Sequence, residues 1–200
     1  MIKKEAIEKL KTLIGVNIRD LAEKYEVTVQ KNGKINKGWF GHTIERYLGL
    51  PINSSQSPNF GSWELKTLPL KRLKNAKIVV KETMAITMID PFNVKTTSFE
   101  ESHLFSKLKK MVICTNIFES KEEKSRILTD VKEFDLANSE LISQIKKDYE
   151  MIREVIKNQG FDYLSGRLGV VVQPRTKGAK NSKSRAFYIR AKYLNEVFLQ

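Results

Sequence analysis

One stretch constrains the fold of this chain more than any other: Trp63-Glu64-Leu65-Lys66 alternates apolar and charged residues. An alternation with a period of two is typical of a β-strand, because successive side chains point to opposite faces. We therefore expect a strand here, with Trp63 and Leu65 in a core and with Glu64 and Lys66 sharing the other face.

The Glu64 carboxylate and the Lys66 ammonium allow two interpretations. A Glu-x-Lys pair suits metal-assisted phosphodiester hydrolysis, in which Glu64 holds Mg²⁺ and Lys66 steadies the attacking water or the charge that builds up on phosphorus. Such a pair also occurs often by chance, and the alternative is a surface ion pair on a half-exposed strand. The spacing alone does not choose between them.

The net charge of the 200-residue chain is +13, which indicates a polyanionic partner. Nucleic acid is the first candidate and an anionic membrane surface the second. The membrane interpretation is the weaker one because no apolar run approaches the length that spans a bilayer. Met1 leads directly into an amphipathic segment without a signal-type apolar run, so we expect a cytoplasmic protein.

The single cysteine, Cys114, excludes an internal disulfide and a Cys-ligated zinc, and we expect it to pack as a small hydrophobe.

Apolar periodicity predicts the main elements. We expect helices over residues 2–14, 18–25, 40–48 and 99–110, and from about 139 to Gly160. Besides the strand at Glu64, we expect strands over 83–89 and 111–117, and we expect the strand over 83–89 to neighbour the Glu64 strand.

Two segments concentrate positive charge. The first, residues 67–81, contains Lys71, Arg72 and Lys74, and no acid lies between Glu64 and Glu82. Such a run is usually a solvated hairpin, but beside a candidate active strand it is well placed to follow a phosphate backbone.

The second segment, residues 163–195, has 8 Lys or Arg and no acid, whereas residues 118–162 carry 11 of the 23 acids. We expect a strand over 168–172, a loop over 173–185 and a return strand from 186. The loop is either a solubilising segment or a nucleic-acid contact, and the charge asymmetry of the flanking strands favours the contact. Its candidate DNA-binding residues are Gln173, Pro174, Arg175, Lys177, Lys180, Lys183 and Arg185.

Four blocks together resemble a known family. The blocks are Lys37-Gly38-Trp39 through Glu45, Gly61 through Pro69, Glu101 through Lys109, and Phe187-Tyr188-Ile189 with the C-terminal Phe198-Leu199-Gln200. In this order they resemble the MutH mismatch-repair endonucleases and their restriction-enzyme relatives, in the Pro-Asp…(Asp/Glu)-x-Lys nuclease superfamily. The resemblance spans nearly the whole chain, whereas no internal repeat, phosphate-binding glycine loop, zinc spacing or serine-nucleophile signature appears.

The resemblance implies a fold and an activity. The fold is α/β (α+β), a mixed sheet flanked by helices in two lobes around a DNA cleft. The catalytic lobe would cover about residues 1–117 and the recognition lobe about residues 118–200. The implied activity is Mg²⁺-dependent cleavage of double-stranded DNA at or near GATC.

The resemblance also implies roles for particular residues. Glu45, Glu64 and Lys66 belong to the active site, and Lys107 matches a lysine near the scissile phosphate. The Lys37-Gly38 turn approaches DNA, the loop from Gln173 to Lys183 reads the major groove, and Tyr188 lies near the adenine whose methylation is sensed. The roles of Glu45, Lys107 and Tyr188 rest on the resemblance to the family alone.

The chain departs from the family pattern at one position. The family has an aspartate shortly before Glu-x-Lys as a main metal ligand, and Asn59 is its nearest counterpart here. An amide has no charge and binds Mg²⁺ poorly, so a metal site of Asn59 and Glu64 predicts slow cleavage or none. The hypothesis is that Asn59 replaces a native aspartate.

Three functions therefore remain open. The leading one is a restriction-type endonuclease, which cuts both strands through two sites acting together, as in a homodimer. The second is a repair nickase that acts as a monomer with a mismatch-repair partner. The third is a sequence-specific DNA-binding protein without catalysis, which Asn59 favours and the intact Glu45, Glu64 and Lys66 oppose.

Overall fold

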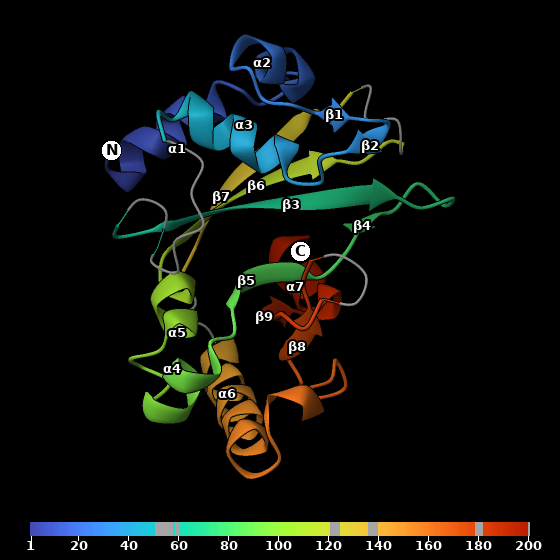
Figure 1. The fold of residues 1–200 in the computed structure, drawn as a ribbon. Helices are drawn as coiled ribbons and strands as arrows, with labels where there is room; N and C mark the ends of the chain where they lie inside the picture. The colour runs from blue at the N-terminus through green and yellow to red at the C-terminus, as the bar shows by residue number, and fades with distance from the viewer. Residues whose placement is uncertain (51–57, 59–60, 121–124, 136–139, 179–181, 200) are drawn as a thin grey trace. The chain divides into compact units, whose positions relative to one another are not determined.

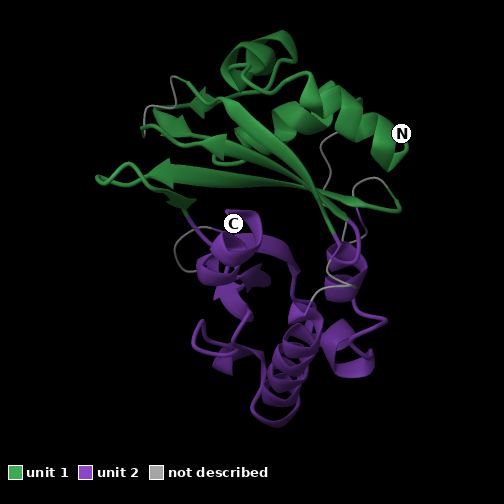
Figure 2. Ribbon diagram, turned by 180° about the vertical axis from the view of Figure 1, so that it is seen from behind, with its two compact units in different colours: residues 1–55, 59–81, 111–134 green, residues 56–58, 82–110, 135–200 purple. Residues whose placement is uncertain are grey.

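The computed structural model describes residues 1–50, 58, 61–120, 125–135, 140–178 and 182–199. The chain forms two compact units, coloured separately in Figure 2. Unit 1 comprises residues 1–55, 59–81 and 111–134, and unit 2 comprises residues 56–58, 82–110 and 135–200. The predicted boundary near residue 117 is not where the division falls, because each unit is assembled from separate stretches of the chain.

Unit 1 begins with the three helices that periodicity predicts: α1 (Lys3–Lys11), α2 (Ile18–Lys24) and α3 (Trp39–Tyr47). A small antiparallel pair, β1 (Gln30–Lys31) and β2 (Lys34–Ile35), connects α2 to α3. The side chain of Asn17 caps α2 by accepting a hydrogen bond from the Arg19 amide at 3.2 Å.

The sheet of unit 1 is mixed and has the strand order β4-β3-β6-β7 (Figure 1). Its strands are β3 (Glu64–Arg72), β4 (Ile78–Val80), β6 (Met111–Ile117) and β7 (Leu128–Phe134). β3 and β6 are parallel, and the other two pairs are antiparallel. The prediction of a mixed sheet flanked by helices is confirmed for this unit.

The helices of unit 1 cover one face of this sheet (Figure 1). Apolar residues of α1, α2 and α3 pack there against alternate residues of β3, β6 and β7 in one buried cluster. Its largest members are Trp39, Phe40 and Trp63. The cluster explains why Trp63 and Leu65 alternate with charged residues, since only the face toward the helices takes apolar side chains at the start of β3.

Unit 2 contains an antiparallel sheet of order β5-β9-β8. The strands are β5 (Met84–Met88), β8 (Val172–Thr176) and β9 (Arg185–Ile189), and the helices are α4 (Pro91–Thr96), α5 (His103–Leu108), α6 (Leu141–Asn158) and α7 (Ala191–Phe198), with a 3-10 turn η2 (Phe161–Tyr163) after α6. The predicted long helix is α6. Among the described helices, none is both long and apolar enough to cross a bilayer.

The predicted pairing of the 83–89 strand with the Glu64 strand is wrong. β5 pairs with β9, and β3 is flanked instead by β4 and β6. The sequence between β3 and β5 contains the short return strand β4, which occupies the position beside β3. Strands β4 and β7 and the helix α4 were not predicted.

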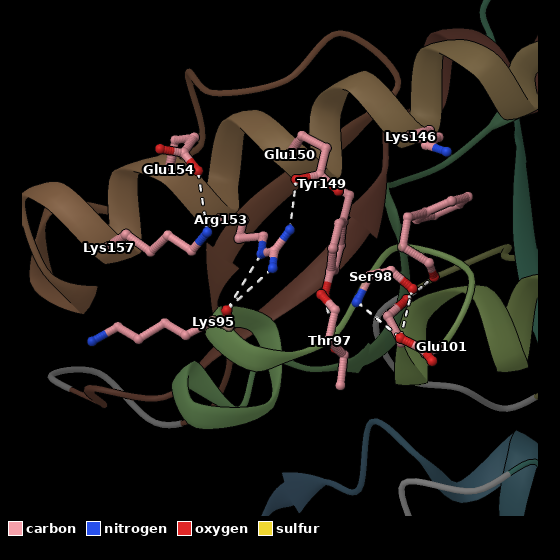
Figure 3. A network of polar contacts seen from close by, with 12 residues as sticks. Lys95, Thr97, Ser98, Glu101, Lys146, Tyr149, Glu150, Arg153, Glu154 and Lys157 are labelled. Atoms are coloured by element: carbon pink, nitrogen blue, oxygen red, sulfur yellow. Dashed lines mark hydrogen bonds and ion pairs between the residues drawn. The ribbon is translucent and has the colours of Figure 1, made fainter.

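Side chains of α6 join this helix to α4 and to the turn after it (Figure 3). The guanidinium of Arg153 donates to the Lys95 carbonyl at 3.3 and 3.4 Å and pairs with Glu150 at 3.1 Å. The Tyr149 hydroxyl donates to the Thr97 carbonyl at 3.3 Å, and burial raises the pKa of this phenol. Charged and polar residues of the acid-rich segment thus hold α4 against α6.

The turn that precedes β8 is organised by Asp148, which lies fully buried on α6. One oxygen of its carboxylate accepts from the Val171 and Val172 amides at 2.7 and 2.8 Å, and the other accepts from Val170 at 2.8 Å. Three backbone amides therefore point at one side chain. The predicted strand over 168–172 is wrong, because Asp148 holds the Val170 and Val171 amides in a turn and β8 begins only at Val172.

Gly169 has φ +74°, a region that L side chains rarely adopt, and an added Cβ would lie 1.8 Å from the Val172 carbonyl oxygen. Replacing Gly169 by alanine should lower the free energy of unfolding by about 3 kcal/mol or more, since both backbone strain and a clash with backbone result. Chemical denaturation measures the change. The matched control is Gly166→Ala in the same turn, whose Cβ would meet its nearest atom at 3.5 Å, an ordinary contact. Equal losses in the two variants would contradict the stated role of Gly169.

Burial raises the pKa of the Cys114 thiol to about 12, with a smaller contribution from Asp130. Because the thiolate is the reactive form, the folded protein should not react with a disulfide reagent at about pH 8, where an exposed thiol with its usual pKa of about 8.5 is partly ionised. In denaturant one thiol per chain should react. Rapid modification of the folded protein would mean that β6 opens readily to solvent.

Candidate active site and basic hairpins

Glu64 and Lys66 lie at the start of β3 and point to the same side of the strand, as predicted. The Lys66 Nζ lies 2.7 Å from the Glu64 Oε1, and the side chains are 20% and 1% exposed respectively. The interpretation as a surface ion pair is therefore wrong, since the carboxylate is almost fully removed from water. Burial of an ion pair is costly and does little for stability, whereas an oriented buried pair is common at functional sites.

The sheet register defines what surrounds this pair. Glu64 is paired with Met111 and Lys66 with Ile113, both fully buried on the parallel strand β6. Because the neighbouring residues on β6 are apolar, the carboxylate and the ammonium are the reactive groups at this place in the sheet.

Glu45 lies on α3, which packs on β3 so that a Cβ at Gly41 would lie 3.8 Å from the Thr67 Oγ1. Figure 1 shows α3 running antiparallel to β3, so the C-terminal half of α3 is directed toward the start of β3. Glu45 is half-buried, and unit 1 thus contains both predicted carboxylates of the active site.

The Lys37-Gly38 turn immediately precedes α3, with Lys37 exposed. A Cβ at Gly38 would lie 2.9 Å from the imidazole of His42, so a larger residue here requires the His42 side chain to move. Burial lowers the pKa of His42, which favours the neutral ring.

A metal site is only partly defined by the described residues. Among them, no group of three or more His, Cys, Asp or Glu side chains is arranged to hold a metal ion. Asn59, the predicted second ligand, lies outside the described residues. Glu64 by itself fits Mg²⁺, which commonly takes one or two protein carboxylates and completes its shell with water and substrate phosphate.

Lys107 belongs to unit 2, on α5, where it is only 6% exposed. The helix is started by Ser102, whose hydroxyl accepts from the Phe105 amide at 3.1 Å. A buried lysine is uncommon, which fits a specific role for Lys107.

The second basic hairpin is formed by β8 and β9, and its loop is shorter than predicted. Gln173 and Pro174 lie in β8 and are buried, so their placement in an exposed loop is wrong. Pro174 is tolerated because β8 is an edge strand. Arg185 lies in β9, and the exposed predicted donors are Arg175, Lys177 and Lys183, while Lys180 lies outside the described residues.

Arg175 is held in a defined orientation. Its guanidinium donates to the Thr83 hydroxyl at 3.0 Å and lies 5.8 Å from the centre of the Tyr188 ring. Burial raises the pKa of Tyr188, so this phenol stays protonated near neutral pH. The sequence did not point to Thr83, because it precedes β5 and is distant from Arg175 in the chain.

The first basic hairpin connects β3 to β4, and the predicted residues Lys71, Arg72 and Lys74 are all exposed on it. It belongs to unit 1, as does the Glu64–Lys66 pair. The two basic hairpins are therefore parts of different units.

Comparison with known proteins identifies the family. The family described as "DNA mismatch repair enzyme MutH" matches residues 48–154, more than half of the chain. Proteins named DNA mismatch repair protein MutH are similar to it: that of Vibrio campbellii is 26% identical, covering 98% of this chain and 92% of its own. That of Pasteurella multocida is 28% identical, with 91% and 81% covered, and that of Haemophilus influenzae PittEE is 29% identical, with 90% and 79% covered.

Among solved structures, the restriction endonuclease MvaI in complex with its cognate DNA covers 90% of this chain and 95% of its own, at 14% identity and a TM-score of 0.37. A TM-score this low does not establish a common fold. The family match and the sequence similarity to the MutH proteins are independent of this structural comparison. The chain belongs to the MutH family of DNA mismatch repair enzymes, and the predicted kinship with DNA endonucleases of this type is confirmed.

Proposed function

We propose that the protein is a Mg²⁺-dependent DNA endonuclease that recognises GATC. The observation that carries the proposal is the Glu64–Lys66 pair, with 2.7 Å between its charged atoms and a carboxylate that is 1% exposed, in a chain of the MutH family. A buried, oriented carboxylate and ammonium at the start of a strand suit hydrolysis of a phosphodiester better than they suit a purely structural role.

Glu64 and the residue at position 59 would hold the metal ion. When bound, Mg²⁺ lowers the pKa of a coordinated water and neutralises charge on the phosphoryl group. The Glu64 carboxylate fits this role because Mg²⁺ prefers oxygen ligands and keeps several waters.

The ammonium of Lys66 is fixed by its ion pair with Glu64, and the Lys66 side chain is 20% exposed, so it can reach a substrate. We assign it to orienting the attacking water and to stabilising the negative charge that develops on the phosphoryl oxygens. Glu45 and Lys107 are assigned supporting roles, which follow from the family pattern.

Double-stranded DNA is the proposed substrate. The exposed cations of the β8–β9 hairpin, Arg175, Lys177 and Lys183, are assigned to DNA contacts, and Tyr188 to the target adenine. Arg175 suits a guanine edge because its contacts with Thr83 and Tyr188 hold the guanidinium in one orientation before binding. A cytoplasmic location is consistent with this role.

Two forms of the activity are distinguishable. Cleavage of both strands would indicate a restriction enzyme acting through paired sites, whereas a single nick would indicate a repair nickase. The relatives named as DNA mismatch repair proteins favour the nickase. Incubating a supercoiled GATC plasmid with the purified protein and counting nicked against linear product separates the two forms.

Restoring the charge at position 59 should raise the activity. We expect Asn59→Asp to cleave a GATC duplex in Mg²⁺ at least about 10- to 100-fold faster than the present sequence. Residues that only hydrogen-bond to a metal ligand already contribute about this factor, and a direct ligand should contribute no less. A time course of product formation measures the difference, and equal rates in both proteins would show that Asn59 is no defect.

Two further variants test the assigned chemistry in the Asn59→Asp background. Glu64→Gln keeps the size of the side chain and removes its charge, so it should abolish Mg²⁺-dependent cleavage while DNA binding in the absence of metal remains. Lys66→Met should also abolish cleavage. If the Asn59→Asp protein binds GATC specifically but never cleaves it in Mg²⁺ or Mn²⁺, the protein is a DNA-binding protein without catalysis.

A further inference from the structure

The β3–β4 hairpin has a basic surface that the proposed active site does not use. Lys71, Arg72, Lys74 and Lys77 are all exposed around its tip. Within the described part of the chain, none of these four side chains is paired with a carboxylate. Four unneutralised cations on one ribbon make a local site for a polyanion.

The tip is closed by its own hydrogen bonds. The Leu73 amide donates to the Lys77 carbonyl at 2.8 Å, and the Ala76 amide donates to the Leu73 carbonyl at 3.0 Å. The Asn75 side chain accepts from the Lys77 amide at 3.2 Å. The cations are therefore presented by an ordered turn, which reduces the entropy lost on binding.

The length of β3 fixes the separation between this tip and the candidate active site. β3 runs without interruption from Glu64 to Arg72 within one unit. Eight steps of about 3.3 Å place Arg72 roughly 26 Å from Glu64.

This separation exceeds the length of the proposed recognition sequence. DNA rises about 3.4 Å per base pair, so four base pairs span about 14 Å, and 26 Å corresponds to about eight base pairs. With β3 running along the duplex, a phosphate that meets the tip while the scissile phosphate lies at Glu64 is outside GATC.

We propose that the β3–β4 hairpin binds the phosphate backbone of DNA that flanks the recognition site, independently of base sequence. The inference rests on the proposed function for the location of the scissile phosphate. The hairpin contributes affinity for long DNA, and the β8–β9 hairpin contributes specificity. Short substrates do not reach the β3–β4 hairpin.

The test compares the variant Lys71→Ala/Lys74→Ala/Lys77→Ala with the parent protein on two duplexes that carry a central GATC. One duplex has about 10 base pairs and cannot reach the tip, and the other has about 30 base pairs and extends past it. Fluorescence anisotropy without metal gives Kd as a function of salt. Arg72 is left intact because it donates to the Ala76 carbonyl at the tip.

We expect the variant to bind the long duplex at least about tenfold more weakly, with a salt slope lower by about 2 to 3, and to bind the short duplex as the parent does. A long duplex without GATC should lose affinity by the same factor. The matched control, Lys4→Ala/Lys11→Ala/Lys24→Ala, removes three exposed charges from α1 and α2 of the same unit and should leave the difference between the two duplexes unchanged.

Equal effects of the two triple variants, or an equal loss on both duplexes, would overturn the proposal. So would unchanged binding to the long duplex. These outcomes are distinct from failure of the proposed function, which is measured by cleavage of the long duplex by the Asn59→Asp protein. Thermal unfolding of both triple variants should match the parent, since all six lysines are exposed.

Discussion

The parallel pairing of β3 with β6 is the interaction on which the rest of the structure depends. It joins residues 64–70 to residues 111–117 in an unbroken register. A parallel pair cannot be connected by a tight turn, so the intervening chain must leave the sheet and return. Part of that chain forms β4, and residues 82–110 enter unit 2. The connection required by one strand pair therefore accounts for the interleaving of the two units.

The same pairing determines the environment of the candidate active site. β6 contributes only fully buried residues beside Glu64 and Lys66, and α3 covers the opposite face of β3 with an apolar core. A carboxylate in this position has little access to water, so its charge is balanced by the ammonium of Lys66. The pair is consequently oriented before any substrate binds, which is the arrangement expected of a catalytic group.

In unit 2, the exposed basic β8–β9 hairpin extends from a turn that side chains hold in place. The buried carboxylate of Asp148 binds the amides before β8, and Arg190 donates to the carbonyls of Gly166, Leu168 and Gly169 at 2.8 to 3.1 Å. Both the amide and the carbonyl groups of the turn are thus hydrogen-bonded to side chains from neighbouring elements. β8, which carries Arg175, starts from this turn, and β9, which carries Tyr188, ends beside it, where the Arg190 amide donates to the Val171 carbonyl at 3.0 Å.

Much of this could be predicted from local patterns. Alternation around Glu64 predicted the strand, its buried face and the shared side of Glu64 and Lys66. Helical periodicity predicted α1, α2, α3 and α6. The predictions failed where the backbone is controlled by distant residues: the valine run after Gly169 has strand composition, but Asp148 binds its amides from α6. Gln173 was expected in a loop because its neighbours are polar, and edge-strand pairing with Tyr188 buries it instead.

The sequence by itself determined the composition of the site, the charge of the two hairpins and the family to which the chain belongs, because these depend on residue identity and spacing along one element. Only the tertiary structure decided that the Glu64 carboxylate is buried, that β5 pairs with β9, and that Thr83 orients Arg175. These features depend on which elements come together across long sequence separations. That choice is made by the combined packing and hydrogen bonding of the whole chain, which no local pattern contains.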